Sequence, residues 1–283
     1  MAQASDVLRE RLPGPVGPTG GGWAAWPVGV RAAALALVLL AVGLGVWELL
    51  VRAQVLLPIM PAPSKVLARA LAMLSDPFYV AGTNDVGIGW QLLSSLRRVA
   101  TGFALAALVA VPLGFVIGMS AVAAKAVDPF VQVLRPVSPL AWLPMGLAVL
   151  QDSERTAVFV IFISAMWPIV LNTIFGVRQV PRTYVDIARI YNASAWTIIR
   201  RVLLPGALPS ILTGLRISLG IAWLVIVAAE MLIGGRGIGY FVWNEWNNLD
   251  IASIIVCIGV IGAVGLGLDR LFGLLERAVA YAE

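Results

Sequence analysis

Six long apolar runs alternate with polar or turn-rich segments along the 283 residues of the chain. Each run holds roughly 20 residues or more, enough for a helix rising about 1.5 Å per residue to cross roughly 30 Å of hydrocarbon. The pattern therefore predicts an all-α, polytopic membrane protein with about six transmembrane helices, at residues 30–51, 99–119, 130–150, 156–177, 208–233 and 252–275.

The order of these runs divides the chain into four predicted regions. Residues 1–28 carry mixed charges and then the tract PGPVGPTGGG, which cannot propagate a helix or strand and indicates a disordered tail. Residues 29–53 are predicted to form the first transmembrane helix, and residues 54–91 a turn-rich segment with a short amphipathic stretch. Residues 92–280 hold the other five helices and include a polar loop at 178–205.

The composition supports a membrane location and excludes several classes of function. The chain is 60% hydrophobic and 12% charged, with a mean hydropathy of +0.93. Its apolar surface is too large for a soluble core of this length, so lipid must cover much of it. The chain contains no histidine and a single cysteine, Cys257, which excludes a disulfide framework, a Cys/His zinc site and a Cys/His nucleophilic pair.

Positive charge is concentrated in the loop at 178–205. The net charge of the chain is +5, and this loop has five arginines against one acid, Asp186. The chain has only two lysines, and its arginines gather at the ends of apolar runs, which orientation in a bilayer explains better than binding to nucleic acid. Because positive loops face the cytoplasm, this loop and, with an even number of spans, both termini are predicted to be cytoplasmic.

The external side would then hold residues 54–91, 151–155 and 234–251. Arg97 and Arg98 would lie at the outer end of the second span, against the positive-inside rule, so they either extend to the interface or have a role there. An aromatic cluster in the last external segment is typical of a membrane interface, with contact to a binding protein as the alternative: Tyr240, Phe241, Trp243 and Trp246.

The third run is interrupted by Pro136, Pro139 and Pro144. Each proline removes a backbone donor and disfavours helix at the preceding residue. Broken backbone at membrane depth is tolerated where it lines a cavity or packs against protein. The run is therefore predicted either to line a cavity or to form an ordinary kink against its neighbours.

The loop at 178–205 resembles the EAA motif of ABC-transporter permeases, which reads Glu-Ala-Ala, three residues, Gly, nine residues and Ile-x-Leu-Pro. Asp186 stands in place of the Glu, Ile187 in place of the first Ala and Asn192 in place of the Gly. Asn is the next-best residue after Gly for a left-handed turn, so the turn is preserved. The resemblance implies two short helices that seat in a groove of a cytoplasmic ATPase subunit, through Asp186, Ala188, Arg189, Asn192, Ala193, Leu204 and Pro205.

The segments around the loop are similar to the nitrate branch of the nitrate/sulfonate/bicarbonate permeases, over about residues 135–275. The similarity is carried by AAEML at 228–232 and WNEWNNL at 243–249. It implies a type I ABC importer permease core and ATP-driven import of nitrate or nitrite, with bicarbonate and sulfonate or taurine as alternative substrates. A secondary transporter is the alternative class, and it would be expected to show an internal repeat, of which no clear sign is present.

The same resemblance implies the partners of the chain. A second permease copy in a homodimer, cytoplasmic ATPase subunits and a periplasmic or lipid-anchored binding protein would complete an importer in the bacterial inner membrane. The sequence has no G-x-x-x-x-G-K-[ST] loop, so ATP and Mg²⁺ are expected on the ATPase partner. The permease itself is expected to carry no catalytic site, cofactor or metal.

Four residues are candidates for the translocation pathway of an anion. Arg216, the only cation in the fifth run, either attracts the anion or serves as an interfacial anchor. Glu230 would be costly if unpaired in an apolar run and would repel an anion, which favours a structural partner such as Arg236 over a lining role. Trp167 and Asn172 form a polar, kinked spot in the fourth run, where the Asn172 amide either donates to an oxyanion or bonds a neighbouring helix.

Overall fold

The computed structural model describes residues 27–82 and 85–280, and all regular structure there is helical apart from an isolated β-bridge between Val80 and Val86. In this part of the chain five helices are long and apolar enough to cross a membrane, or six if one bent pair counts as a span. The chain divides into two compact units, one ending at Ser64 and the other beginning at Lys65. Residues 1–26 of the predicted disordered tail lie outside the described residues.

The first unit contains α2 (Val28–Arg52), which corresponds to the first predicted span. None of its residues is buried within the protein, and its leucines and valines are exposed along the whole helix. At its end, the Glu48 carboxylate pairs with Arg52 at 2.8 Å and accepts hydrogen bonds from the backbone N and Oγ of Ser64. A helix this apolar that buries nothing within the chain is covered by lipid or by another protein.

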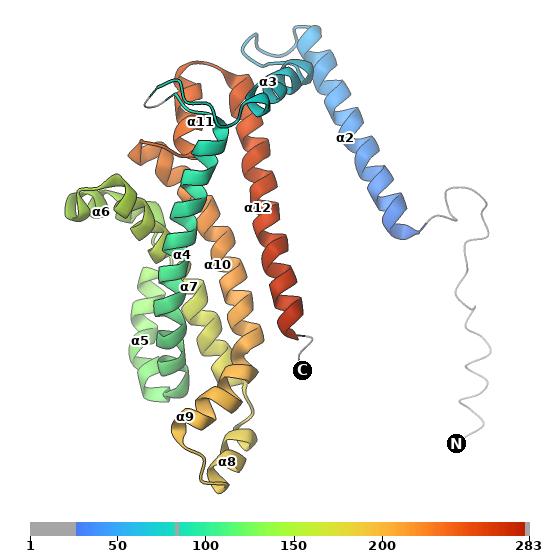
Figure 1. The fold of residues 1–283 in the computed structure, drawn as a ribbon. Coiled ribbons are helices and arrows are strands. Elements are labelled where there is room, and N and C mark those ends of the chain that lie inside the picture. The colour runs from blue at the N-terminus through green and yellow to red at the C-terminus, as the bar shows by residue number, and fades with distance from the viewer. Residues whose placement is uncertain (1–26, 83–84, 281–283) are drawn as a thin grey trace, which may run out of the picture. The chain divides into compact units, whose positions relative to one another are not determined.

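The second unit is a bundle of long helices with short helices at both ends (Figure 1). The α8–α9 loop lies at one end of the bundle, and α11 lies at the other. The elements are α3 (Pro63–Ser75), α4 (Ile88–Met119), α5 (Ala121–Leu134), η2 (Pro139–Trp142), α6 (Leu143–Leu150), α7 (Ser153–Gln179), α8 (Arg182–Ile190), α9 (Ala195–Ile198), η3 (Ile199–Leu203), α10 (Leu204–Ile233), α11 (Ile238–Asn247) and α12 (Ile251–Ala280).

The centre of the bundle is α7, which packs extensively against both α4 and α10. Both neighbours carry a small residue at every fourth position: Gly102, Ala106, Ala110, Gly114 and Gly118 on α4, and Gly206, Ser210, Gly214, Ser218 and Ala222 on α10. Small residues let helix backbones approach closely, which is the main source of packing between helices in lipid. The approach is so close that a Cβ added at Gly114 would lie 2.6 Å from Cβ of Thr173.

The apolar run predicted as a span at residues 130–150 forms a bent pair of helices, either a broken span or a re-entrant loop, and the pair begins earlier than predicted. Its first half, α5, begins at Ala121, where the Ser120 Oγ accepts a hydrogen bond from the Ala123 N. The chain then turns by 89° before η2 and α6. Pro136 and Pro139 explain the bend, because neither can donate to a continuing helix. Residues 121–129, which precede the predicted span, are therefore the first part of a helix.

Two further differences lie at the α11 end of the bundle. The second span was predicted from residue 99, but α4 begins at Ile88 and buries Gln91, Ser95 and Arg98 in its first three turns. The predicted external segment at 234–251 contains α11, which follows a turn of three glycines with positive φ. Hydropathy places the ends of spans where residues become polar, and here the polar residues face protein.

Candidate functional site

The turn between α8 and α9 is built from the residues that carry the EAA resemblance. Asn192 has a φ of 53°, in the left-handed region, as predicted for this position. The Ala193 N donates to the Ala188 O at 3.0 Å, and the Asn192 N donates to the Arg189 O at 2.9 Å. This pair of bonds is the Schellman arrangement, which satisfies carbonyls left open at the end of a helix. Ser194 then begins α9, because its Oγ accepts from the Thr197 N.

The loop has a buried side and an exposed side. On the buried side, Ala188 and Ala193 pack against a cluster that includes Ile198, Leu203 and Ala207. The exposed side carries large apolar and aromatic side chains that are 46–81% exposed: Tyr184, Ile187, Ile190, Tyr191 and Trp196. A rigid two-helix projection with an apolar outer face is typical of a protein-docking surface.

Charged residues surround this exposed apolar face. Asp186 and Arg189 form a wide ion pair at 3.7 Å with side chains 64% and 70% exposed, so both remain accessible to a partner. Such an exposed pair contributes little to stability. Leu204 and Pro205 begin α10, which continues directly from the π-helical turn η3, and Pro205 has no N–H to donate to that turn.

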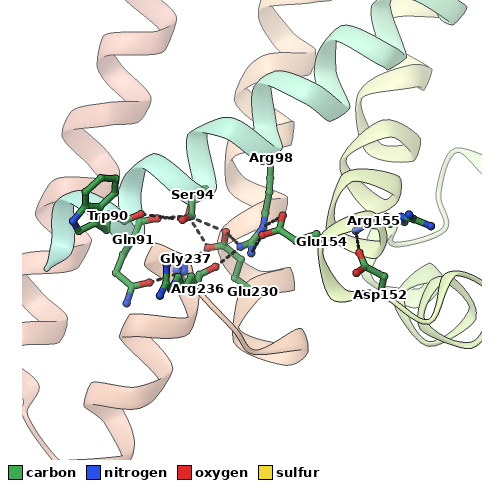
Figure 2. A network of polar contacts seen from close by, with 12 residues as sticks. Trp90, Gln91, Ser94, Arg98, Asp152, Glu154, Arg155, Glu230, Arg236 and Gly237 are labelled. Atoms are coloured by element: carbon green, nitrogen blue, oxygen red, sulfur yellow. Dashed lines mark hydrogen bonds and ion pairs between the residues drawn. The ribbon is translucent and has the colours of Figure 1, made fainter. Parts of the chain in front are cut away.

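At the other end of the bundle, Glu230 of α10 lies in a buried polar network (Figure 2). Its carboxylate is 2.7 Å from the Arg98 Nη1 of α4, and only 1% of Glu230 is exposed. The same guanidinium binds Glu154 of α7 through Nε at 2.9 Å and Nη2 at 2.7 Å. Arg98 therefore joins α4, α7 and α10 through two carboxylates.

The network also fixes the turn before α11. Glu230 accepts a hydrogen bond from Ser95 at 2.8 Å and from the Gly239 N at 3.0 Å. The Gly237 N donates to the Gln91 side chain at 2.7 Å, and the Arg236 backbone carbonyl accepts from Arg98. We call these residues the Glu230 network: Gln91, Ser95, Arg98, Glu154, Glu230 and the backbone of 236–239.

Glycine is required where the turn crosses this network. Gly237 has a φ of 150°, and a Cβ there would overlap the Glu230 carboxylate. A Cβ at Gly239 would overlap the backbone carbonyl of Val227. Sequence reasoning singled out Glu230 and Arg98 separately but missed Gln91 and Ser95. Their spacing with Arg98, at 91, 95 and 98, places all three on one helix face and was the available signal.

Arg216 lies between two acids of α12. Its guanidinium makes paired contacts with Asp269, at 2.7 Å from Nε and 2.8 Å from Nη2, and a longer contact with Glu276 at 3.3 Å. The side chain is 39% exposed, and its charge is compensated by these carboxylates. The structure thus places Arg216 in a link between α10 and α12, and its role in a pathway stays a prediction.

Trp167 and Asn172 lie on α7, one on each side of Pro168 in the sequence. The Asn172 Nδ2 donates to the Pro168 carbonyl at 2.8 Å, and its Cβ faces Gly214 of α10. Both side chains are partly exposed, and lining of a pathway by them stays a prediction. Among the described residues, no group of three or more His, Cys, Asp or Glu side chains is arranged to hold a metal ion.

These features together define a class of protein. Long apolar helices that pack through small residues, with an exposed two-helix loop at one end and a buried ion-pair network at the other, are typical of a membrane transport subunit. The family of binding-protein-dependent transport system inner membrane components matches residues 110–281, and the chain belongs to this family.

Two relatives with similar sequences are named for different anions. The nitrate import permease protein NrtB of Synechocystis sp. is 47% identical over 246 residues, which cover 87% of this chain and 89% of that protein. The bicarbonate transport system permease protein CmpB of the same organism is 43% identical over 237 residues, covering 83% and 84%.

Two solved structures resemble the fold. The MetNI methionine ABC transporter in an inward-facing conformation matches with a TM-score of 0.58 and 16% identity, over 66% of this chain and 93% of that one. An amino acid ABC transporter crystallised with histidines matches with a TM-score of 0.57 and 14% identity, over 77% and 100%. At these identities the likeness concerns the fold, which is that of an ABC importer permease.

Proposed function

We propose that the chain is the permease subunit of an ATP-driven importer of nitrate or nitrite. The observation that carries this proposal is the 47% identity to a nitrate import permease over 87% of the chain. Bicarbonate is the second candidate, because a bicarbonate permease is nearly as similar, at 43% identity. Both are small singly charged anions, which need only a few donors and a modest positive potential for passage.

The α8–α9 loop supports coupling to a cytoplasmic ATPase. Its Schellman turn holds two short helices at a fixed angle, and its exposed side chains offer an apolar surface with charges beside it. ATP and Mg²⁺ would bind on that ATPase, and closure of an ATPase pair would move the loops of two permease copies toward each other. A homodimer, with the loop and both termini in the cytoplasm, fits this arrangement. A binding protein would deliver the anion at the α11 end.

Identification of the anion requires the complete importer. The permease, ATPase and binding protein are reconstituted in nanodiscs, and ATP hydrolysis is measured with nitrate, nitrite, bicarbonate and taurine. We expect nitrate or nitrite to stimulate hydrolysis at the lowest concentration. Stimulation by bicarbonate alone would transfer the assignment to the second candidate, and stimulation by taurine alone would contradict both.

Trp167, Asn172, Arg216 and Glu230 remain proposed pathway residues, and Arg216→Gln is the most direct test among them. If Arg216 attracts the anion, the variant should transport about tenfold less or worse while assembly with the ATPase is unchanged, since a charge-assisted contact contributes about 1.5–3 kcal/mol. Uptake per assembled complex equal to wild type at all anion concentrations would remove Arg216 from the pathway and leave it the link to α12.

A further inference from the structure

A pocket at the α11 end of the bundle has no part in the proposed coupling. Its volume is about 440 Å³, within the range of small-molecule binding sites. Its walls come from α3, the connection from α3 to α4, the start of α4, and α11. The residues that give it chemical character are Arg69, Tyr79, Asp85, Tyr240, Phe241 and Glu245.

Glu245 is the unusual residue of this pocket. Only 9% of it is exposed, yet within the part of the chain that the structure describes its carboxylate makes no hydrogen bond or ion pair. Burial, and secondly the nearby charge of Asp250, raise the pKa of the Glu245 carboxyl. The charge of Arg69 partly offsets this rise, but among the described residues no donor lies within hydrogen-bond distance of the Glu245 carboxylate, which faces the pocket and can accept a donor there.

The nearest cation does not supply this donor. The Arg69 Nε donates to the Ser253 Oγ at 2.7 Å, and its Nη2 lies 3.1 Å from the Asp250 Oδ2. Asp250 also accepts hydrogen bonds from the N and Oγ of Ser253. Burial alone would raise the pKa of Asp250, but the Ser253 bonds and the charge of Arg69 together lower it. Arg69 and Asp250 therefore neutralise each other while they link α3 to α12.

The remaining lining favours a cation. Asp85 adds a second carboxylate, which accepts a hydrogen bond from the Tyr79 hydroxyl at 2.9 Å. The rings of Tyr79, Tyr240 and Phe241 line the same space, and aromatic faces attract guanidinium and ammonium groups. With Arg69 paired to Asp250, the two other carboxylates give the pocket a negative balance, which excludes an anion as its ligand.

We propose that this pocket binds a guanidinium or alkylammonium group, with Glu245 as the principal charged partner and Asp85 as the second. The group is either a basic side chain of the protein that delivers the anion or a free organic cation. The choice between these sources rests on the proposed function, because a delivery protein would dock at this end. The site itself does not depend on the transported anion.

The first experiment measures binding of methylguanidinium to the full-length chain in nanodiscs of phosphatidylcholine, by ligand-observed NMR. Glu245→Gln should weaken binding about tenfold or more, because it removes a charged partner in a partly desolvated site. Asp85→Asn, on an exposed residue whose loss should leave folding intact, should weaken binding as well. Asp76→Asn removes an exposed acid just after α3 that does not line the pocket, and its binding should equal wild type.

Failure of wild type to bind methylguanidinium, or equal binding by wild type, Glu245→Gln and Asp85→Asn, would overturn the proposal. If Glu245→Gln does not fold, the pH dependence of wild-type binding decides. Because the pKa of Glu245 is raised, its carboxylate is lost earlier than usual as pH falls, so binding should weaken on mild acidification. Binding that is constant down to the pH where ordinary carboxylates titrate would also overturn it.

The second experiment separates the two sources with the assembled importer and its delivery protein. If the source is a side chain, Glu245→Gln weakens docking of the delivery protein, and methylguanidinium competes with docking to wild type. If the source is a free cation, the delivery protein docks equally well to wild type and to Glu245→Gln, while binding of methylguanidinium still requires Glu245. Both outcomes uphold the site, and neither requires that nitrate be the substrate.

Discussion

At the scale of single residues, Arg98 shows how one cation can serve two carboxylates in a low-dielectric setting. Each of its three guanidinium nitrogens donates to Glu230 or Glu154, and Nη1 also donates to the Arg236 backbone carbonyl. Removal of one member of such a buried group leaves an uncompensated charge, which costs more than the group contributes when it is complete.

We expect Arg98→Gln to lower the free energy of unfolding by about 3–5 kcal/mol, because it leaves Glu230 buried without its cation. Thermal unfolding in nanodiscs measures the loss. The neighbouring Arg97 is exposed, so Arg97→Gln is the matched control and should change stability by less than about 1 kcal/mol. The double variant Arg98→Gln/Glu230→Gln should lose less stability than the sum of the losses in the two single variants, and losses that simply add would show that the pair is not coupled.

Asn192 carries the second prediction at this scale. Its left-handed backbone, with a φ of 53°, costs a β-branched residue about 1–2 kcal/mol more than it costs glycine. Asn192→Gly should therefore keep anion-stimulated ATP hydrolysis near wild type, whereas Asn192→Val should reduce it severalfold at equal expression. The turn has no special role in coupling if the two variants hydrolyse ATP alike.

At the scale of elements, the small-residue faces of α4 and α10 decide how closely the bundle packs. Gly114 faces Thr173 so closely that Gly114→Ala must displace α7, at a net cost of about 1–2 kcal/mol after the helix propensity of alanine is counted. Gly262 of α12 has nothing within 4 Å of an added Cβ, so Gly262→Ala should be neutral or stabilising. Thermal unfolding measures the stability of the two variants. Equal stability of Gly114→Ala and Gly262→Ala would show that α4 can move away from α7 without cost.

The elements also show which parts of the fold the sequence could predict. Apolar length correctly predicts α2, α7, α10 and α12, whether the helix buries nothing within the protein, as α2 does, or packs at the centre of the bundle, as α7 does. It misplaces the start of α4, since Gln91, Ser95 and Arg98 are polar but face protein. The bend after α5 could be expected from its prolines, but its angle of 89° depends on packing that no local signal encodes.

The candidate site also has parts that the sequence could predict and parts that it could not. The turn at Asn192 follows from local backbone chemistry, and the sequence contains all of that information. The partner of Glu230 comes from 132 residues earlier in the chain, so it required the arrangement of α4 against α10. The unpaired carboxylate of Glu245 is likewise visible only once α3, α4 and α11 have been brought together around it.

At the scale of the whole molecule, the α8–α9 loop presents large exposed apolar side chains at one end of the bundle. Asp186→Arg reverses the single acid of a loop that otherwise carries five arginines, and it breaks only a weak surface pair. We therefore expect normal insertion and stability, with capture of the ATPase reduced about tenfold or more in a pull-down. Asp76→Arg, at the other end of the bundle, is the control, and wild-type ATPase capture by the Asp186 variant would contradict docking through this loop.

The Glu230 network also has a consequence for how the protein is made. Glu154 follows Arg98 by 56 residues and Glu230 follows it by 132, so Arg98 is synthesised before either carboxylate. At about 5–20 residues per second, the wait for Glu230 lasts roughly 7–26 s. Until Glu154 is made, Arg98 has neither of its carboxylates, and until Glu230 is made it has only one of the two. We expect chains truncated before residue 230 to be recognised and degraded by membrane quality control, with Arg98 as the feature that marks them as unfinished.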